Sequence, residues 1–153
     1  METMSPQLRR ALESTCATSV EKVLRARNAQ DLAVLRSILR SRDESSRSMR
    51  QSAIQILGRW GDREAVPAIR ALLPGFDERE RINAVDALGR IGGAEAEAAV
   101  LALSEDESPD VRRFAAYALA RLGSSTATDR QRQMERSDPE PSTRKAAQRS
   151  LRR

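Results

Sequence analysis

The sequence contains no histidine, one cysteine and four aromatic residues among its 153 positions. Histidine is the commonest general base and metal ligand, so its absence removes the simplest catalytic and metal-binding arrangements. Cys16 cannot form a disulfide within the chain, and we expect it to be a small apolar residue rather than a reactive thiol. We therefore predict neither a metal nor a cofactor.

Other absences narrow the class of protein. No apolar run reaches the roughly 18 residues of a membrane span, and the N-terminal METMSPQLRRALES lacks the apolar stretch of a signal peptide, so we predict a cytoplasmic location. The P-loop, GxGxxG and GxSxG motifs are also absent. Asp86 with Glu78 or Glu80 is better interpreted as surface charge than as a catalytic pair. We predict that the protein is not an enzyme.

Charge is divided unevenly along the chain, although the formal net charge is only +5. Residues 61–110 carry five Arg against twelve Asp and Glu, whereas residues 111–153 carry eleven basic residues against four acidic ones. Arginine outnumbers lysine 25 to 2. A GC-rich genome explains this bias, and so does the use of forked guanidinium groups in recognition.

One line of sequence is written three times. MRQSAIQILGRWG (49–61), ERINAVDALGRIG (80–92) and VRRFAAYALARLG (111–123) follow one another at a step of 31 residues, and TRKAAQRSLRR (143–153) follows at a step of 32. A repeat of this length is typical of stacked supersecondary units. Apolar residues at helical spacing predict one helix per copy, and Gly61, Gly92 and Gly123 suit the helix ends.

The segments between the copies also read as helices, at 31–39, 62–73 and 93–104. We therefore predict a single all-α domain, an α-solenoid of antiparallel helical hairpins. Its expected parts are one amphipathic capping helix at 5–27, repeat units at 31–61, 62–92 and 93–123, and an atypical C-terminal unit at 124–153. The polar stretch 124–138 is expected to be helical in part and weakly packed.

The line VRRFAAYALARLG, together with DESPD before it and LGRWGDREAVPAIRALL, resembles HEAT repeats of the short, phycobilisome-lyase-like type. The resemblance covers residues 31–123 well and 139–153 in part. It implies a right-handed superhelix in which the VRRFAAYALARLG helices line the concave face and the EAVPAI helices form the convex face. It implies little about activity, because function depends on the side chains that a fold presents.

The resemblance implies exposed concave positions in each unit. They are Gln51, Ser52, Gln55, Arg59, Ile82, Asn83, Asp86, Arg90, Arg113, Phe114, Tyr117, Arg121, Lys145, Arg149 and Arg153. Four of these arginines share one column because the repeat brings them into register: Arg59, Arg90, Arg121 and Arg153. Packed helices stand about 8–10 Å apart, so we expect about that spacing along the column. The column is either a recognition ladder or a set of solvated side chains near helix C-termini. Phe114 and Tyr117, one turn apart, are candidate interface anchors.

A second arginine column has a structural interpretation. It contains Arg50, Arg81, Arg112 and Arg144. The resemblance implies that these side chains pair with acidic residues in the loops between units. Trp60 aligns with Ile91 and Leu122, so we expect it to pack in the core.

The preferred hypothesis is a non-enzymatic module that binds a protein or peptide on its concave face. The candidate binding residues are Arg59, Asn83, Asp86, Arg90, Arg113, Phe114, Tyr117, Arg121 and Arg149. The alternative is binding of nucleic-acid phosphates through Arg113, Arg121, Arg149, Arg152 and Arg153, which the acidic middle of the chain disfavours. A third possibility, an accessory subunit of an enzyme such as a lyase, is not separated from the first by sequence.

Overall fold

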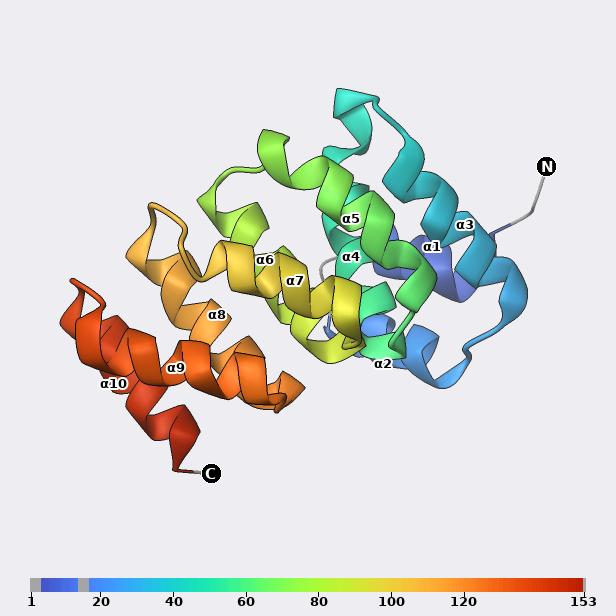
Figure 1. Cartoon of the computed structure of the whole chain (residues 1–153). Coiled ribbons are helices and arrows are strands. Elements are labelled where there is room, and N and C mark those ends of the chain that lie inside the picture. Colours follow the sequence, from blue (N-terminus) through green and yellow to red (C-terminus); the bar gives the residue numbers. More distant parts are fainter. Residues whose placement is uncertain (1–3, 14–16, 153) are drawn as a thin grey trace.

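The chain folds into paired α-helices, as the computed structural model shows for residues 4–13 and 17–152 (Figure 1). The helices are α1 (Pro6–Glu13), α2 (Ala17–Arg25), α3 (Ala29–Arg40), α4 (Arg47–Trp60), α5 (Val66–Leu72), α6 (Glu78–Ile91), α7 (Ala94–Leu103), α8 (Pro109–Leu122), α9 (Ser125–Ser137) and α10 (Pro141–Leu151). Short 3₁₀ turns lie at Glu44–Ser46, Arg63–Ala65 and Leu73–Gly75. The described residues contain no strand, and the predicted all-α solenoid is confirmed.

The helices form two layers. Helices α4, α6, α8 and α10 pack side by side as the inner layer, and α3, α5, α7 and α9 pack as the outer layer (Figure 1). Each helix of the repeated line therefore belongs to the inner layer, and each intervening helix belongs to the outer layer. The inner layer carries the positions that the sequence assigned to the concave face.

Local sequence signals explain where the inner helices begin and end. Asp77 and Glu80 form a reciprocal capping box at the start of α6, and Ser108 caps α8 ahead of a proline in its first turn. Gly61 and Gly123 end α4 and α8 with φ of 66°, a left-handed conformation that glycine adopts without steric cost. The repeated line is thus an inner helix with a signal for its start and a signal for its end.

Glycine also sets how closely the inner helices approach. A Cβ atom added at Gly58 would lie 2.7 Å from Ala87, and one added at Gly89 would lie 2.7 Å from the Cβ of Ala118. These separations are too short for carbon atoms in contact. The column of small residues therefore lets α4, α6 and α8 pack backbone to backbone.

The hydrophobic core lies between the two layers. Leu57, Leu88 and Leu119 occupy the same repeat position and are fully buried, and Ile69 and Val100 face them from the outer layer. Trp60 is buried, as expected from its alignment with core positions. The guanidinium of Arg27 lies 5.9 Å from the Trp60 ring and donates to the Trp60 carbonyl, so the indole also anchors the N-terminal part.

The N-terminal part differs from the prediction. Instead of one capping helix over 5–27, the structure has α1 and α2, which pack against each other and against α4. A hairpin buries Leu8, Leu12 and Val23 against α4 in the place of a preceding inner helix. The predicted apolar role of Cys16 lies outside the described residues.

The polar segment 124–138 also departs from the prediction. It forms a continuous helix, α9, which is packed against α8 and α10. Ala127 and Met134 supply its apolar contacts, and buried Gln131 donates to the carbonyl of Ala116. Arg130 donates to the side chain and carbonyl of Ser104. Hydrogen bonds thus replace the apolar area that the composition lacks.

Two of the four arginines in the second column pair with loop carboxylates, as the resemblance implied. Arg81 and Arg112 form ion pairs at 2.9 Å with Asp106 and Asp138 of the following loops. All four members also donate to backbone carbonyls just before their own helices; the carbonyl partners belong to Ser41, Asp43, Phe76, Asp106, Glu107, Asp138 and Pro139. This use of loop carbonyls was not anticipated. These hydrogen bonds hold each loop against the helix that follows it.

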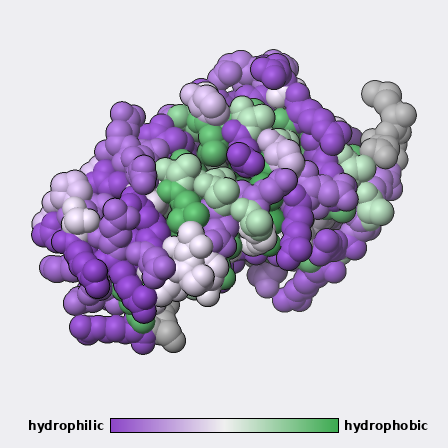
Figure 2. All heavy atoms as spheres, in the orientation of Figure 1, coloured by the Kyte–Doolittle hydropathy of each residue, from purple (hydrophilic) through white to green (hydrophobic). Residues whose placement is uncertain are grey.

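The outer face is mainly hydrophilic, with apolar side chains gathered near the middle of the view over α5 and α7 (Figure 2). Half-buried Ala68, Leu72 and Leu101 belong to these helices and continue the core toward the surface. The outer layer is therefore a cover for the core, and most of the polar candidates lie on the other side of the molecule.

Candidate binding groove on the inner face

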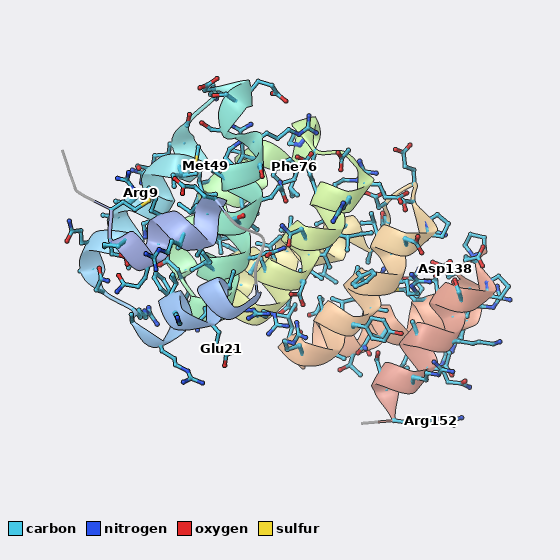
Figure 3. The ribbon with its side chains drawn as sticks, turned by 180° about the vertical axis from the view of Figure 1, so that it is seen from behind. Arg9, Glu21, Met49, Phe76, Asp138 and Arg152 are labelled. Carbon is cyan, nitrogen blue, oxygen red and sulfur yellow. The ribbon has the colours of Figure 1, made fainter. Side chains whose placement is uncertain are left out.

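A groove of about 730 Å³ runs across the inner face. Its lining comes from α1, α2, α4, α6 and α8 and from the loop before α6; the lining residues are Ala11, Val20, Ser48, Gln51, Ser52, Gln55, Asp77, Arg79, Glu80, Ile82, Asn83, Asp86 and Phe114. Figure 3, seen from this side, shows α1 and α2 beside the row of inner helices. The repeat thus brings predicted positions from three successive units into one depression.

The N-terminal hairpin forms one wall of this groove. Ala11 from α1 and Val20 from α2 line it, and Phe114 of α8 lies at the other side of the floor formed by α4 and α6. Neither Ala11 nor Val20 was among the predicted site residues. The amphipathic pattern of residues 5–27 could have identified an apolar surface, but it could not show where a second helix would turn back.

Amide groups join two units at the groove floor. Asn83 Nδ2 lies 2.7 Å from Gln51 Oε1 and 3.2 Å from the Gln51 carbonyl oxygen. Gln51 Nε2 is buried and has no hydrogen-bond acceptor among the described residues. Asn83 was predicted to contact a partner, and the structure also gives it a role in holding α6 against α4. Ser52 and Gln55 extend the polar floor along α4.

The loop before α6 contributes an acidic edge that is held in place. Arg47 donates two hydrogen bonds of 2.6 Å to Glu80, and Glu80 accepts from the backbone N–H of Asp77. The hydrogen bonds from Arg47 lower the pKa of Glu80, against the opposing effect of burial. Asp77, Glu80 and Arg79 were not predicted as site residues, although the capping-box spacing of Asp77 and Glu80 could have identified the first two as ordered.

The first arginine column is not an even ladder. Arg90 and Arg121 both form ion pairs with Asp86, at 2.9 Å and 3.0 Å. One carboxylate of α6 therefore binds two arginines of the column, one on α6 and one on α8. Arg59 is exposed and has no acidic partner among the described residues. Arg153 lies outside the described residues. The structure therefore groups Arg90 and Arg121 around Asp86, whereas Arg59 is not part of this cluster.

Asp86 is ionised at neutral pH. Burial disfavours its charge, but the hydrogen bonds from Arg90 and Arg121 outweigh burial and lower its pKa below the ordinary value. All three side chains remain about two-fifths exposed. The cluster therefore carries a net positive charge that solvent or a partner can reach.

The aromatic pair lies beside this cluster on α8. The Phe114 and Tyr117 rings are 6.3 Å apart with an interplanar angle of 83°, an edge-to-face contact. Phe114 is half-buried and lines the groove, whereas Tyr117 is more exposed, with 40% of its surface accessible. Arg113 pairs with Asp110 at 2.8 Å and stands 5.8 Å from the Phe114 ring. Arg113 is thus partly neutralised within α8.

Arg149, on α10, is exposed and lies at the repeat position of Tyr117. It does not line the groove. No group of three or more His, Cys, Asp or Glu side chains among the described residues is arranged to hold a metal ion. In the same part of the chain, no helix combines the length and apolar character needed to cross a bilayer.

Comparison with known families agrees with this architecture. HEAT repeats match at residues 32–101 and 73–152, which together include all the inner helices. No curated protein matches the chain. The two matches cover most of the sequence and fall on the helical hairpins described above, and the chain therefore belongs to the HEAT-repeat proteins.

Proposed function

We propose that this protein is a non-enzymatic interaction module that binds an extended segment of another protein in its inner groove. The observation that carries this proposal is the groove itself, which three successive inner helices line at equivalent repeat positions. HEAT repeats are commonly protein-interaction scaffolds, and stacked repeats present extended concave surfaces for binding. The short phycobilisome-lyase-like type and a cytoplasmic location are part of the proposal, and an accessory subunit of an enzyme such as a lyase is an alternative that would use the same surface.

The groove suits a peptide in shape and chemistry. Neighbouring inner helices stand about 8–10 Å apart, and an extended chain advances about 3.3 Å per residue, so each unit faces about three peptide residues. Gln51, Gln55 and Asn83 offer amide groups to peptide carbonyls and N–H groups.

Specificity comes from the C-terminal side of the groove. Phe114 and Tyr117 provide apolar area for one hydrophobic side chain of the partner, and Arg90 and Arg121 provide charge for an acidic one. The helices that carry these groups are already packed, so binding costs little ordering of the protein.

Peptide selection from a random library, followed by titration calorimetry, tests this proposal. The triple variant F114A/Y117A/R121A should weaken the selected peptide at least tenfold, because it removes both anchors and one charge. A control triple R63A/R70A/Q133A changes exposed outer-layer residues and should alter affinity less than twofold. Unchanged affinity in the inner-face variant, with its helical circular dichroism intact, would overturn the assignment.

Phosphate binding is the weaker candidate. Of the arginines considered for it, Arg113 and Arg121 are ion-paired with Asp110 and Asp86, and Arg153 is outside the described residues. Arg149 and Arg152 are left as exposed cations. A random duplex should therefore bind weakly, and a log–log salt slope steeper than about −3 would instead favour nucleic acid as the ligand.

A further inference from the structure

Each inner helix uses one face to contact the next inner helix, and we call this its stacking face. In α4 this face includes Arg47, Gln51 and Gly58: Arg47 binds Glu80, Gln51 accepts from Asn83, and Gly58 lies against Ala87. In α8, the Pro109 carbonyl accepts from Thr143 of α10 in the same way. The stacking face of α10 contacts no later helix among the described residues, so the side chains on it can be compared with those that α4 and α8 use for stacking.

The repeat identifies those residues. At the 31- and 32-residue steps, Gln51 corresponds to Lys145 and Gly58 corresponds to Arg152. Arg149 stands one turn from Lys145 and adjoins the stacking face. All three cations are exposed and have no acidic partner among the described residues, and α10 contains no Asp or Glu. Arg152 lies near the free end of the ribbon (Figure 3).

The substitution of arginine for glycine changes what can dock there. Gly58 and Gly89 permit backbone contact with the next helix, whereas the long side chain of Arg152 holds any neighbour away. Another repeat of the same kind therefore cannot stack closely on α10. A second copy of this face is also unsuitable, because the two sets of cations would repel each other.

The three cations repel one another along the helix, and an anionic partner would relieve this repulsion. Lys145, Arg149 and Arg152 follow an i, i+4, i+7 pattern, and like charges at these spacings destabilise a helix. Position near the helix C-terminus offsets part of this cost for Arg149 and Arg152. Inside the stack, arginines at unit boundaries meet carboxylates, as in Arg47–Glu80 and Arg112–Asp138.

We propose that Lys145, Arg149 and Arg152 form a docking stripe for an acidic helix of a partner protein. The stripe spans about 10.5 Å, from seven residues at 1.5 Å each, and a helix with carboxylates at i, i+4 and i+7 has the same spacing. The long side chains bridge the distance that Arg152 imposes. This site is separate from the inner groove, so it stands whether or not the groove binds a peptide.

The observations favour a helix over a nucleic acid. Arg144 of α10 is engaged with the carbonyls of Asp138 and Pro139, and Arg113 and Arg121 are bound to carboxylates. Within α10, the cations that remain free therefore lie on a single helical stripe. Three phosphate contacts would give little affinity at physiological salt.

The test uses a fluorescent 21-residue Ala/Gln-based helical peptide with Glu at i, i+4 and i+7, and a second peptide with the same three Glu at i, i+2 and i+5. Anisotropy titrations with the full chain at 50 mM salt should show at least fivefold tighter binding of the first peptide, because its carboxylates share one face. Equal binding of the two peptides, or no binding of either, would overturn the proposal.

Matched variants separate the stripe from general charge. K145Q/R149Q/R152Q should weaken the first peptide at least tenfold, whereas R40Q/R63Q/R70Q, with the same change in charge, should weaken it less than twofold. The variant R149E should regain binding with a peptide whose central Glu is Lys. Equal losses in the two triple variants, absence of this rescue, or tighter stripe-dependent binding of a random RNA or DNA would each refute an acidic-helix site.

Discussion

The boundary between α6 and α8 differs from the boundary between α8 and the C-terminal pair α9–α10. Gly89 meets Ala118 at the first boundary, and the helices pack through small side chains. The corresponding residue at the second boundary is Ala120, and two hydrogen bonds are added there: Gln131 with the Ala116 carbonyl and Thr143 with the Pro109 carbonyl. Both boundaries also carry an ion pair, Arg81 with Asp106 at the first and Arg112 with Asp138 at the second. Close packing of small residues holds one pair of inner helices together, and hydrogen bonds contribute more to holding the next pair.

Arg112→Met should break the polar boundary and give the largest effect. It leaves the Asp138 carboxylate buried without its guanidinium, and loss of one partner from a buried pair costs about 3–5 kcal/mol. Hydrogen exchange should accelerate in α9 and α10 while α4 and α6 stay protected. The control Arg132→Met removes an exposed pair with Asp129 and should change stability by less than about 1 kcal/mol. Uniform acceleration throughout the chain would contradict separate boundaries.

Gly89→Ala should break the close-packed boundary. The added Cβ would lie 2.7 Å from Ala118, and such overpacking costs about 1–3 kcal/mol, which exceeds or offsets the helix propensity gained. Urea unfolding followed by circular dichroism measures the change. Gly75→Ala is the matched control, because nothing lies within 4 Å of its added Cβ and its φ is not positive. A stabilised Gly89→Ala protein would show that the boundary relaxes freely.

Acid should weaken the polar boundary. Burial opposes ionisation of Asp138, but hydrogen bonds from Arg112 and the Glu140 N–H outweigh it and lower its pKa. A lowered carboxylate pKa contributes stability above the unfolded-state value near 4, and this contribution is lost as pH falls through the folded-state pKa. Unfolding free energy should therefore fall below about pH 4, with a smaller slope in D138N. Identical slopes would mean that other carboxylates dominate.

Asp86→Asn should give the smallest change in stability. It should also make the cluster of Arg90 and Arg121 at the inner surface more positive. The side chains of Asp86, Arg90 and Arg121 are about two-fifths exposed, so the loss should be below about 1 kcal/mol. The substitution frees two guanidiniums, and an acidic peptide selected for the groove should then bind more tightly. Calorimetry at low and high salt checks this, and weaker binding would indicate that Asp86 itself contacts the partner.

The sequence was sufficient for features that repeat. Helix ends at Gly61 and Gly123 and the burial of Trp60 follow from position within the 31-residue repeat, and the ion pair of Arg112 follows from the family resemblance. The pairing of Asp86 with both Arg90 and Arg121 could not be predicted, because it depends on side-chain rotamers across two helices. The order of α9 was also missed, because composition counts apolar area and not hydrogen bonds such as that of Gln131.

The glycine contacts have a geometric consequence for the inner surface. A Cβ atom at Gly58 or Gly89 would lie 2.7 Å from the neighbouring inner helix, so a side chain at either position would push two inner helices apart. Because α4, α6 and α8 all contribute to the groove, such a shift would also widen it. The width of the groove therefore depends on the absence of a side chain at one position in two successive repeats.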